Sequence, residues 1–156
     1  MKTLRRRRKQ GKTDYKARFS LLKSGQPRLV IRKTNRYIIA QIVISDVAQD
    51  KVVASVSSRD LLGAGWPKEK TGCLKGLVAA YLTGYMLAQK TKANFKALVL
   101  DTGLNTSVSG SRIYAALMGA VEGGLKIPHD AKIFPSKERM QANEKTKTLL
   151  KLKEKI

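Results

Sequence analysis

The chain has 156 residues, with 32 Lys or Arg against 11 Asp or Glu, and therefore carries a formal net charge of +21. This length allows one domain with a hydrophobic core of its own, while the single Cys73 and the single His129 exclude an internal disulfide and a structural zinc site. No segment approaches the roughly 18 continuous apolar residues of a membrane span, and no apolar signal core follows the basic first residues. We therefore expect a soluble intracellular protein without a bound metal or cofactor.

The net charge indicates the kind of partner. Self-repulsion among so many cations disfavours a compact isolated chain, whereas a dense polyanion is bound strongly when Lys and Arg displace its counterions. Nucleic acid fits this description best. A membrane surface is the alternative polyanion, but the basic residues are not confined to one face of an amphipathic helix, so we expect no membrane contact.

The first residues form a basic arm followed by a short helix. The arm, residues 1–13, contains the run Arg5 to Lys9 and cannot form a core, so we expect no regular structure there until phosphates neutralise it. Asp14 is suited to begin a helix, in which apolar residues recur at helical spacing and which ends at Ser24-Gly25.

Three strands are predicted next, from Gln26 to Lys33, from Arg36 to about Ile44 and from Lys51 to Ser58, and they form a β meander. Alternation along these strands separates an apolar face from a polar one. The apolar face is predicted to hold Leu29, Ile31, Ile38, Ala40, Ile42, Ile44, Val52, Ala54 and Val56. The opposite face is predicted to hold Arg28, Arg32, Tyr37, Gln41, Ser55 and Ser57. We expect this opposite face to be open and basic, although the apolar residues interspersed on it allow partial cover by another element.

The remaining sequence predicts two helices and one strand. Thr71 is expected to cap a helix that lasts to about Lys90, after a loop rich in glycine and proline. Residues 97–100 predict a short buried strand, and a second helix is expected from about Ser111 to Glu122. The order of strands, helix, strand and helix predicts an α/β sandwich. The chain is thus expected to comprise the arm at 1–13, a globular domain at 14–134 and a lysine-rich C-terminal extension at 135–156.

The distribution of basic residues favours contact with RNA or DNA over a merely solubilising tail, because they recur throughout the folded part. Few aromatic residues are interleaved with them, so an extended platform for base stacking is not predicted. Tyr37, beside Arg36, is the best candidate for a stacking or sugar contact.

Two alternatives to a structural RNA-binding protein stay open at this point. Asp46, Asp101 and Glu122 could bind magnesium in an RNA-processing nuclease, because clustered acids at strand ends can hold two metals for phosphodiester cleavage. Simpler interpretations exist, since Glu122 ends a helix and Asp46 follows Ser45 in a turn-like segment. A generic nucleic-acid-binding protein is the second alternative.

Strings spread along nearly the whole chain occur together in one known family. They are Arg5-Arg6-Arg7-Arg8 with Gly11-Lys12-Thr13-Asp14-Tyr15, Pro27-Arg28-Leu29-Val30, Asn35-Arg36-Tyr37-Ile38-Ile39-Ala40-Gln41, Tyr81-Leu82-Thr83-Gly84, Gly110-Ser111-Arg112, and Ile127-Pro128-His129 with Phe134-Pro135-Ser136. Their order and spacing make the match specific. The chain resembles the archaeal-type large-subunit ribosomal protein L-eighteen family, whose members bind 5S ribosomal RNA.

The resemblance implies a mixed sheet, made of the three-strand meander and a further strand, with helices packed on one face. It also implies a structural, non-enzymatic constituent of the cytoplasmic ribosome that anchors 5S rRNA in the central protuberance, beside ribosomal protein L-five and near the large-subunit rRNA. No small-molecule substrate is expected. Carried over residue by residue, the RNA-binding surface comprises Arg5, Arg6, Arg7, Arg8, Lys9, Lys12, Tyr15, Lys16, Arg18, Arg28, Arg32, Asn35, Arg36, Tyr37, Gln41, Ser57 and Arg59. The lysine-rich tail from Lys145 to Ile156 departs from the usual pattern of the family.

Overall fold

The computed structural model describes residues 6–46, 49–91, 95, 97–141, 149–150 and 152–153. Its α-helices are α1 (Arg6–Lys9), α2 (Tyr15–Lys23), α3 (Leu77–Thr91), α4 (Arg112–Glu122) and α5 (Lys137–Met140). Its strands are β1 (Arg28–Lys33), β2 (Ile38–Asp46), β3 (Gln49–Ser57) and β4 (Val99–Asp101). Short 3-10 helices occur at η1 (Ser58–Leu62), η2 (Lys68–Cys73) and η3 (Ala131–Ile133).

The strands form one mixed sheet in the order β3-β2-β1-β4. The meander is antiparallel, and β4 joins the other side of β1 in parallel. The register pairs Leu29 with Ile42 and Ile31 with Ala40, which places these four side chains on one face, where all are buried. The predicted α/β fold with a meander and a further strand is therefore confirmed.

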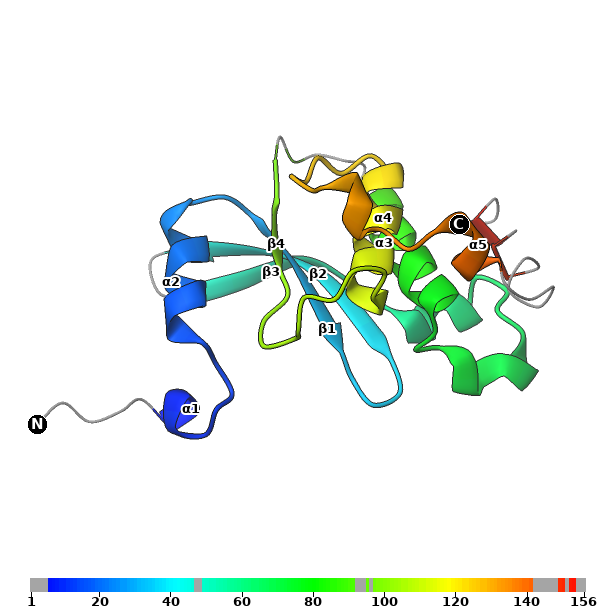
Figure 1. Ribbon diagram of the computed structural model, residues 1–156, viewed down its shortest axis with the longest axis horizontal. Helices are drawn as coiled ribbons and strands as arrows, with labels where there is room; N and C mark the ends of the chain where they lie inside the picture. Colours follow the sequence, from blue (N-terminus) through cyan, green and yellow to red (C-terminus); the bar gives the residue numbers. More distant parts are fainter. Residues whose placement is uncertain are drawn as a thin grey trace, which may run out of the picture.

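Helices α3 and α4 lie side by side and cover this apolar face (Figure 1). Two glycines allow the helices to approach closely. A Cβ on Gly84 would lie 1.9 Å from the carbonyl oxygen of Ala116, and a Cβ on Gly119 would lie 2.0 Å from that of Tyr81. The helix backbones therefore touch at these positions, and no larger residue fits between them. None of the described helices is long and apolar enough to cross a membrane.

Three details differ from the expectations. Helix α3 begins at Leu77 rather than Thr71, because the preceding segment, which contains Gly72 and Gly76, forms a 3-10 helix and a turn instead. Ile44 and Val52 were predicted in the core but are exposed. A register shift at Ile42/Val43 changes the alternation of buried and exposed residues toward the turn between β2 and β3. The arm, expected without regular structure, has one helical turn at Arg6–Lys9 with no buried side chain.

Side chains of the C-terminal extension take part in the core. Leu149 and Leu152 are buried in the same cluster as the residues of α3 and α4. Next to them, the ammonium group of Lys153 donates a hydrogen bond to Glu122 at 2.8 Å, and the Tyr81 hydroxyl donates to the same carboxylate oxygen. Burial alone would raise the pKa of Glu122, but these two hydrogen bonds and the charge of Lys153 outweigh it and lower that pKa. The last described residues are thus attached to the end of α4.

Candidate nucleic-acid interface

Arg28 lies inside a network of ion pairs and not on an open surface. Its side chain is only 2% exposed. Nη1 donates to Asp101 Oδ2 at 2.9 Å, and Nη2 donates to Ser45 Oγ and to Asp50 Oδ1, each at 2.9 Å. The expectation that Arg28 projects from an open face is therefore wrong. Both terminal nitrogens of its guanidinium donate to protein acceptors, while the buried Nε has no hydrogen-bond partner among the described residues. We assign Arg28 the structural role of joining β1, β2, β3 and β4.

Arg32 lies on the same face of β1 as Val30, two residues later. Its guanidinium is held by hydrogen bonds, yet its side chain is partly exposed. Nη2 donates to Asp101 Oδ1 at 2.7 Å, while Nη1 donates to the carbonyl oxygens of Asp101 at 2.7 Å and Ile31 at 3.0 Å. The side chain nevertheless keeps 39% of its surface exposed. Because Asp101 is held between two arginines, Arg32 is oriented before any ligand arrives.

Helix α2 is attached to the end of the sheet where β1 begins (Figure 1). Asp14 caps the helix by accepting hydrogen bonds from the backbone N–H groups of Lys16 and Ala17, and Arg18 pairs with Asp50 at 2.6 Å. Burial alone would raise the pKa of Asp50. Hydrogen bonds from Ser45 and Arg18, together with the charges of Arg18 and Arg28, outweigh burial, and the pKa is lowered.

The arm supplies exposed cations beside α2. Arg6, Arg7, Arg8 and Lys9 are all exposed on α1, and Lys12 and Lys16 are exposed as well. Arg7 Nε donates to Thr13 Oγ1 at 3.0 Å, which holds the helical turn against the start of α2. Arg5, also predicted to bind RNA, lies outside the described residues.

A cleft of about 720 Å³ opens between this arm, α2 and the loop that follows β4. Its lining includes four cations and two carboxylates, and both carboxylates already have donors within the protein. The charged residues are Arg7, Lys12, Arg18, Arg32, Asp14 and Asp101. The cleft therefore has a net positive lining.

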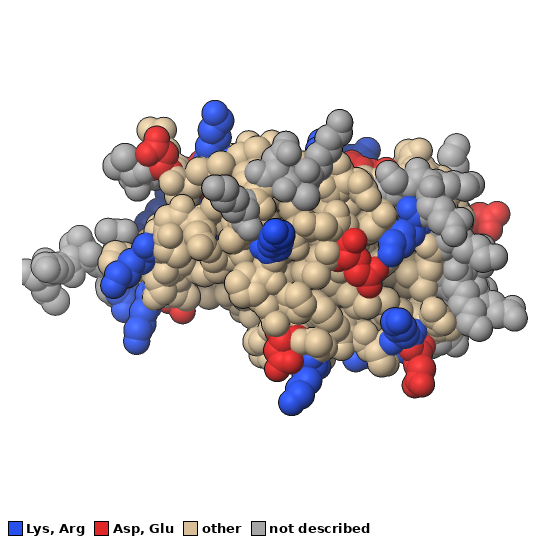
Figure 2. All heavy atoms as spheres, turned by 90° about the horizontal axis from the view of Figure 1, so that it is seen from above, with Lys and Arg blue, Asp and Glu red and all other residues tan. Residues whose placement is uncertain are grey.

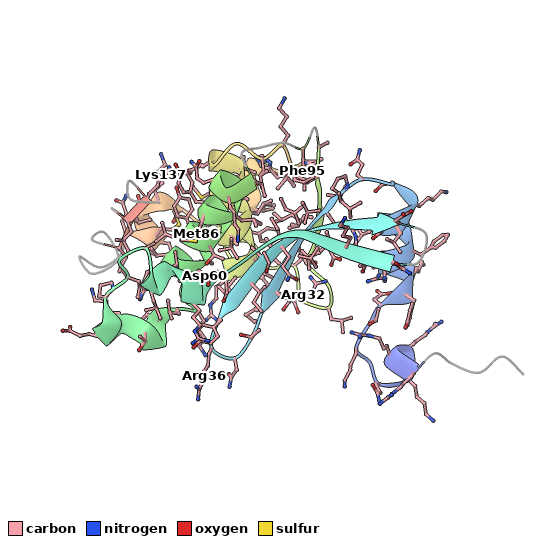
Figure 3. All side chains as sticks on the ribbon, turned by 180° about the vertical axis from the view of Figure 1, so that it is seen from behind. Arg32, Arg36, Asp60, Met86, Phe95 and Lys137 are labelled. Carbon is pink, nitrogen blue, oxygen red and sulfur yellow. The ribbon has the colours of Figure 1, made fainter. Side chains whose placement is uncertain are left out.

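A second group of candidate residues lies at the other end of β1. Asn35 and Arg36 are exposed in the turn between β1 and β2, and Arg36 points outward from its tip (Figure 3). Arg59, in η1, is also exposed. The backbone N–H of Ile38 donates to Ser58 Oγ at 3.1 Å, so η1 begins next to this turn. The fold thus brings Arg36 and Arg59 to the same end of the sheet.

The remaining predicted contacts are less exposed. Gln41 donates to Ser55 Oγ at 3.1 Å across the polar face, and the Ser57 hydroxyl accepts from the N–H of Arg59 as part of the cap of η1. Tyr37 is half-buried and packs against the core, and Tyr15 is half-buried too. These side chains take part in contacts within the protein and present only part of their surface to a ligand.

Three segments of the candidate interface lie on one side of the molecule. In Figure 1, α1, the loop between β4 and α4, and the turn between β1 and β2 all lie along the lower side of the view. The upper side, seen in Figure 2, carries basic side chains that stand apart from one another, some beside acidic ones, with broad uncharged areas between them. The described part of the arm, the loop after β4 and the hairpin turn therefore lie on the side away from that mixed face, although the arm and the turn are at opposite ends of β1.

Sequence reasoning missed the residues that organise this side. Asp50 and Asp101 are the acceptors that bind Arg18, Arg28 and Arg32, and neither was predicted to support the interface from its local pattern. A usable signal did exist for Asp101, because an acid at the end of a buried strand needs a partner. Nothing local indicates which arginine that partner is.

The acids of the nuclease hypothesis do not come together. Asp101 is bound by arginines, whereas Glu122 is bound by Tyr81 and Lys153 at the end of α4. Within the part of the chain that the structure describes, no group of three acidic, histidine or cysteine residues could hold a metal ion.

Comparison with known proteins identifies the family of the chain. A family described as ribosomal large subunit proteins 60S L5 and 50S L18 matches residues 1–98 and 90–130. The large ribosomal subunit protein uL18 of Korarchaeum cryptofilum is 43% identical over 150 residues, covering 96% of this chain and 75% of that protein. The uL18 proteins of Methanoregula boonei and Methanoculleus marisnigri are 41% and 44% identical over 158 and 137 residues, covering 97% and 87% of this chain and 88% and 76% of theirs.

These matches confirm the resemblance found in the sequence strings, and the family is one of structural, non-enzymatic proteins of the cytoplasmic ribosome. The chain therefore belongs to the family of ribosomal large-subunit proteins that includes 60S L5 and 50S L18, as an archaeal-type member and a structural constituent of the large ribosomal subunit.

Proposed function

We propose that this chain binds 5S rRNA and helps to anchor it in the central protuberance, beside ribosomal protein L-five and in contact with the large-subunit rRNA. The observation that carries the proposal is the position of the exposed cations of α1, together with Arg32 and Arg36, on one side of the fold (Figure 3). The family resemblance supports 5S rRNA as the partner, and the net charge of +21 supports a polyanion.

Two parts of this surface have different tasks in the proposed complex. The exposed arm supplies phosphate contacts, which are independent of sequence and release counterions. Arg32 is held by Asp101, and Asn35 and Arg36 project from a turn closed by hydrogen bonds between Thr34 and Tyr37, so these residues set the register on the RNA through sugar and base contacts. Arg28 supports this surface from inside and does not touch the RNA in our proposal.

The proposal is tested by titrating the purified chain against 5S rRNA, a length-matched random RNA and duplex DNA over a range of salt concentrations. We expect a preference for intact 5S rRNA that persists as salt rises, because register contacts are less salt-dependent than phosphate contacts. Equal and equally salt-labile binding to all three would reduce the chain to a generic polyanion binder. Loss of RNA only when magnesium is added would instead favour the nuclease.

Single-residue variants test whether the hairpin turn contributes to the preference for 5S rRNA or only to the overall positive charge. Arg36→Ala is expected to lower the affinity for 5S rRNA more than that for random RNA. Lys126→Ala removes one exposed charge from the segment after α4 and is the matched control, which should leave the preference unchanged. Equal effects of the two variants on the preference would contradict the proposed role of the hairpin turn.

A further inference from the structure

The cleft between α2 and the loop after β4 is concave, and binding to the outside of an RNA duplex does not require a concave site. Its volume of about 720 Å³ lies in the range of sites that enclose a small ligand, roughly 300–1,000 Å³. Phosphate contacts along a duplex need exposed cations and do not require such a hollow. The cleft therefore fits a group that leaves the RNA and enters the protein.

Arg32 provides a planar and fixed surface in this cleft. Three hydrogen bonds to Asp101 and Ile31 hold its guanidinium, which removes most of the entropy cost of ordering it later. Gly103 packs against it: with a φ of +61°, a Cβ there would lie 2.9 Å from Cζ, 3.1 Å from Nη2 and 3.2 Å from Nε. These similar distances indicate that the Gly103 backbone approaches the flat side of the group. Arg32 also lines the cleft, and its side chain as a whole keeps 39% of its surface exposed.

The other lining residues match the parts of a nucleotide. Leu21 and Leu104 offer apolar contact for a base, and Leu104 is 57% exposed. Arg7 and Lys12 are exposed cations at the arm side, suited to the flanking phosphates. Asn105 and Thr102 add polar groups from the loop itself. The cleft is thus lined by a planar guanidinium, by apolar side chains and by cations suited to phosphates.

We propose that this cleft binds one unpaired nucleotide of the RNA, with its base stacked on the guanidinium of Arg32 and its phosphates neutralised by Arg7 and Lys12. The inference rests on the proposed function, because it assumes that RNA approaches from this side. Unpaired bases that leave an RNA stack are commonly held on arginine planes or aromatic rings, and this cleft supplies an arginine plane.

Photo-crosslinking of the full chain to 5S rRNA tests the proposal. Leu104→p-benzoylphenylalanine places the probe in the cleft, and Phe19→p-benzoylphenylalanine is the control, because Phe19 is 70% exposed on α2 and does not line the cleft. Reverse-transcription stops then locate the linked nucleotides. We expect the Leu104 probe to mark one unpaired nucleotide or a few adjacent ones. Stops on both strands of a paired segment, or no crosslink while 5S rRNA is bound with full affinity, would overturn the proposal.

Substitutions of Arg32 test whether it binds the RNA by stacking on a base or only by its positive charge. Arg32→Lys keeps the positive charge but removes the plane, so we expect it and Arg32→Ala to weaken 5S rRNA binding alike, by about 5- to 150-fold, the range for loss of one stacked base. Both variants should also reduce the Leu104 crosslink, and thermal melts of each confirm that it is folded. Full affinity of Arg32→Lys with an unchanged crosslink pattern would exclude stacking and leave only a charge contact. In that case the preference for 5S rRNA stands and only the inference about the cleft fails.

Discussion

Arg28 and Asp101 form a buried ion pair in which Nη1 lies 2.9 Å from Oδ2 and the two side chains are 2% and 7% exposed. The pair connects β1 with β4, strands that are distant in sequence and parallel in the sheet. Asp101 still has Arg32 when Arg28 is removed, but its Oδ2 and the Oδ1 of Asp50 lose their charged donor, so the pair matters most when it is broken on one side only.

Arg28→Ala is therefore expected to lower the free energy of unfolding by about 3–5 kcal/mol, the range for breaking one side of a buried ion pair. Urea unfolding at neutral pH measures this change. Arg36→Ala is the matched control, because the same truncation of an exposed arginine should change stability by no more than about 0.5 kcal/mol. Equal stabilities of the two variants would show that the buried pair contributes nothing.

The lowered pKa of Asp50 predicts a specific dependence of stability on pH. Its pKa in the folded chain lies below the value of 3.8 of an unperturbed aspartate, so ionised Asp50 stabilises the fold above that pH and the stabilisation is lost as the pH falls through the folded pKa. Asp50→Asn should thus be less stable than the unmodified chain at pH 6, and the difference should shrink below about pH 4. Denaturant titrations from pH 6 to 3 measure it. A difference that stays constant over this range would contradict the assignment.

The close approach of α3 and α4 predicts that a single methyl group is harmful there. Gly119→Ala places a Cβ against the Tyr81 carbonyl and should force the helices apart, at a cost of at least about 3 kcal/mol, the upper end of typical overpacking. Gly72→Ala is the control, because nothing lies within 4 Å of the Cβ it adds. Thermal unfolding of both variants measures this loss of stability. A Gly119→Ala chain as stable as its control would show that the helices can separate freely.

The buried end of the C-terminal extension predicts that this segment stabilises the domain. Leu152→Ala should cost about 2–5 kcal/mol, because the side chain is only 8% exposed in the core cluster. Leu104→Ala removes the same atoms from an exposed position and should change the free energy of unfolding little. If both leucine variants unfold at the same denaturant concentration, the extension does not contribute to the core.

The arm predicts a change in salt dependence rather than in specificity. Replacing Arg6, Arg7 and Arg8 together with alanine should lower the slope of log affinity against log salt by about 0.7–0.9 for each phosphate that the arm no longer neutralises, equally on 5S and random RNA. Filter binding at several salt concentrations gives the slope. The control replaces Lys126, Lys132 and Lys137 with alanine, which removes the same charge from exposed sites elsewhere. Equal slopes for the two triple variants would argue against direct phosphate contacts by the arm.

Local patterns in the sequence determined the elements and the class of partner. Alternation in the meander identified Leu29, Ile31, Ala40 and Ile42 as core residues, because a strand with one buried face repeats every second residue. Asp14 identified the start of α2, because a side-chain oxygen can accept the free N–H groups of a first helical turn. The excess of Lys and Arg indicated a polyanion without any knowledge of the fold.

Only the tertiary structure decided which of the basic residues are available to a ligand. Arg28 and Arg32 occupy equivalent positions in the alternation of β1, yet one is buried and the other keeps exposed surface. The difference arises because Asp101, 73 residues after Arg28, is brought beside β1 by the parallel pairing of β4. Tertiary packing likewise produces three further features: the cleft, the contact of Gly84 and Gly119 with facing helices, and the burial of Leu152. Each depends on segments far apart in the chain, whose distance in space no local periodicity encodes.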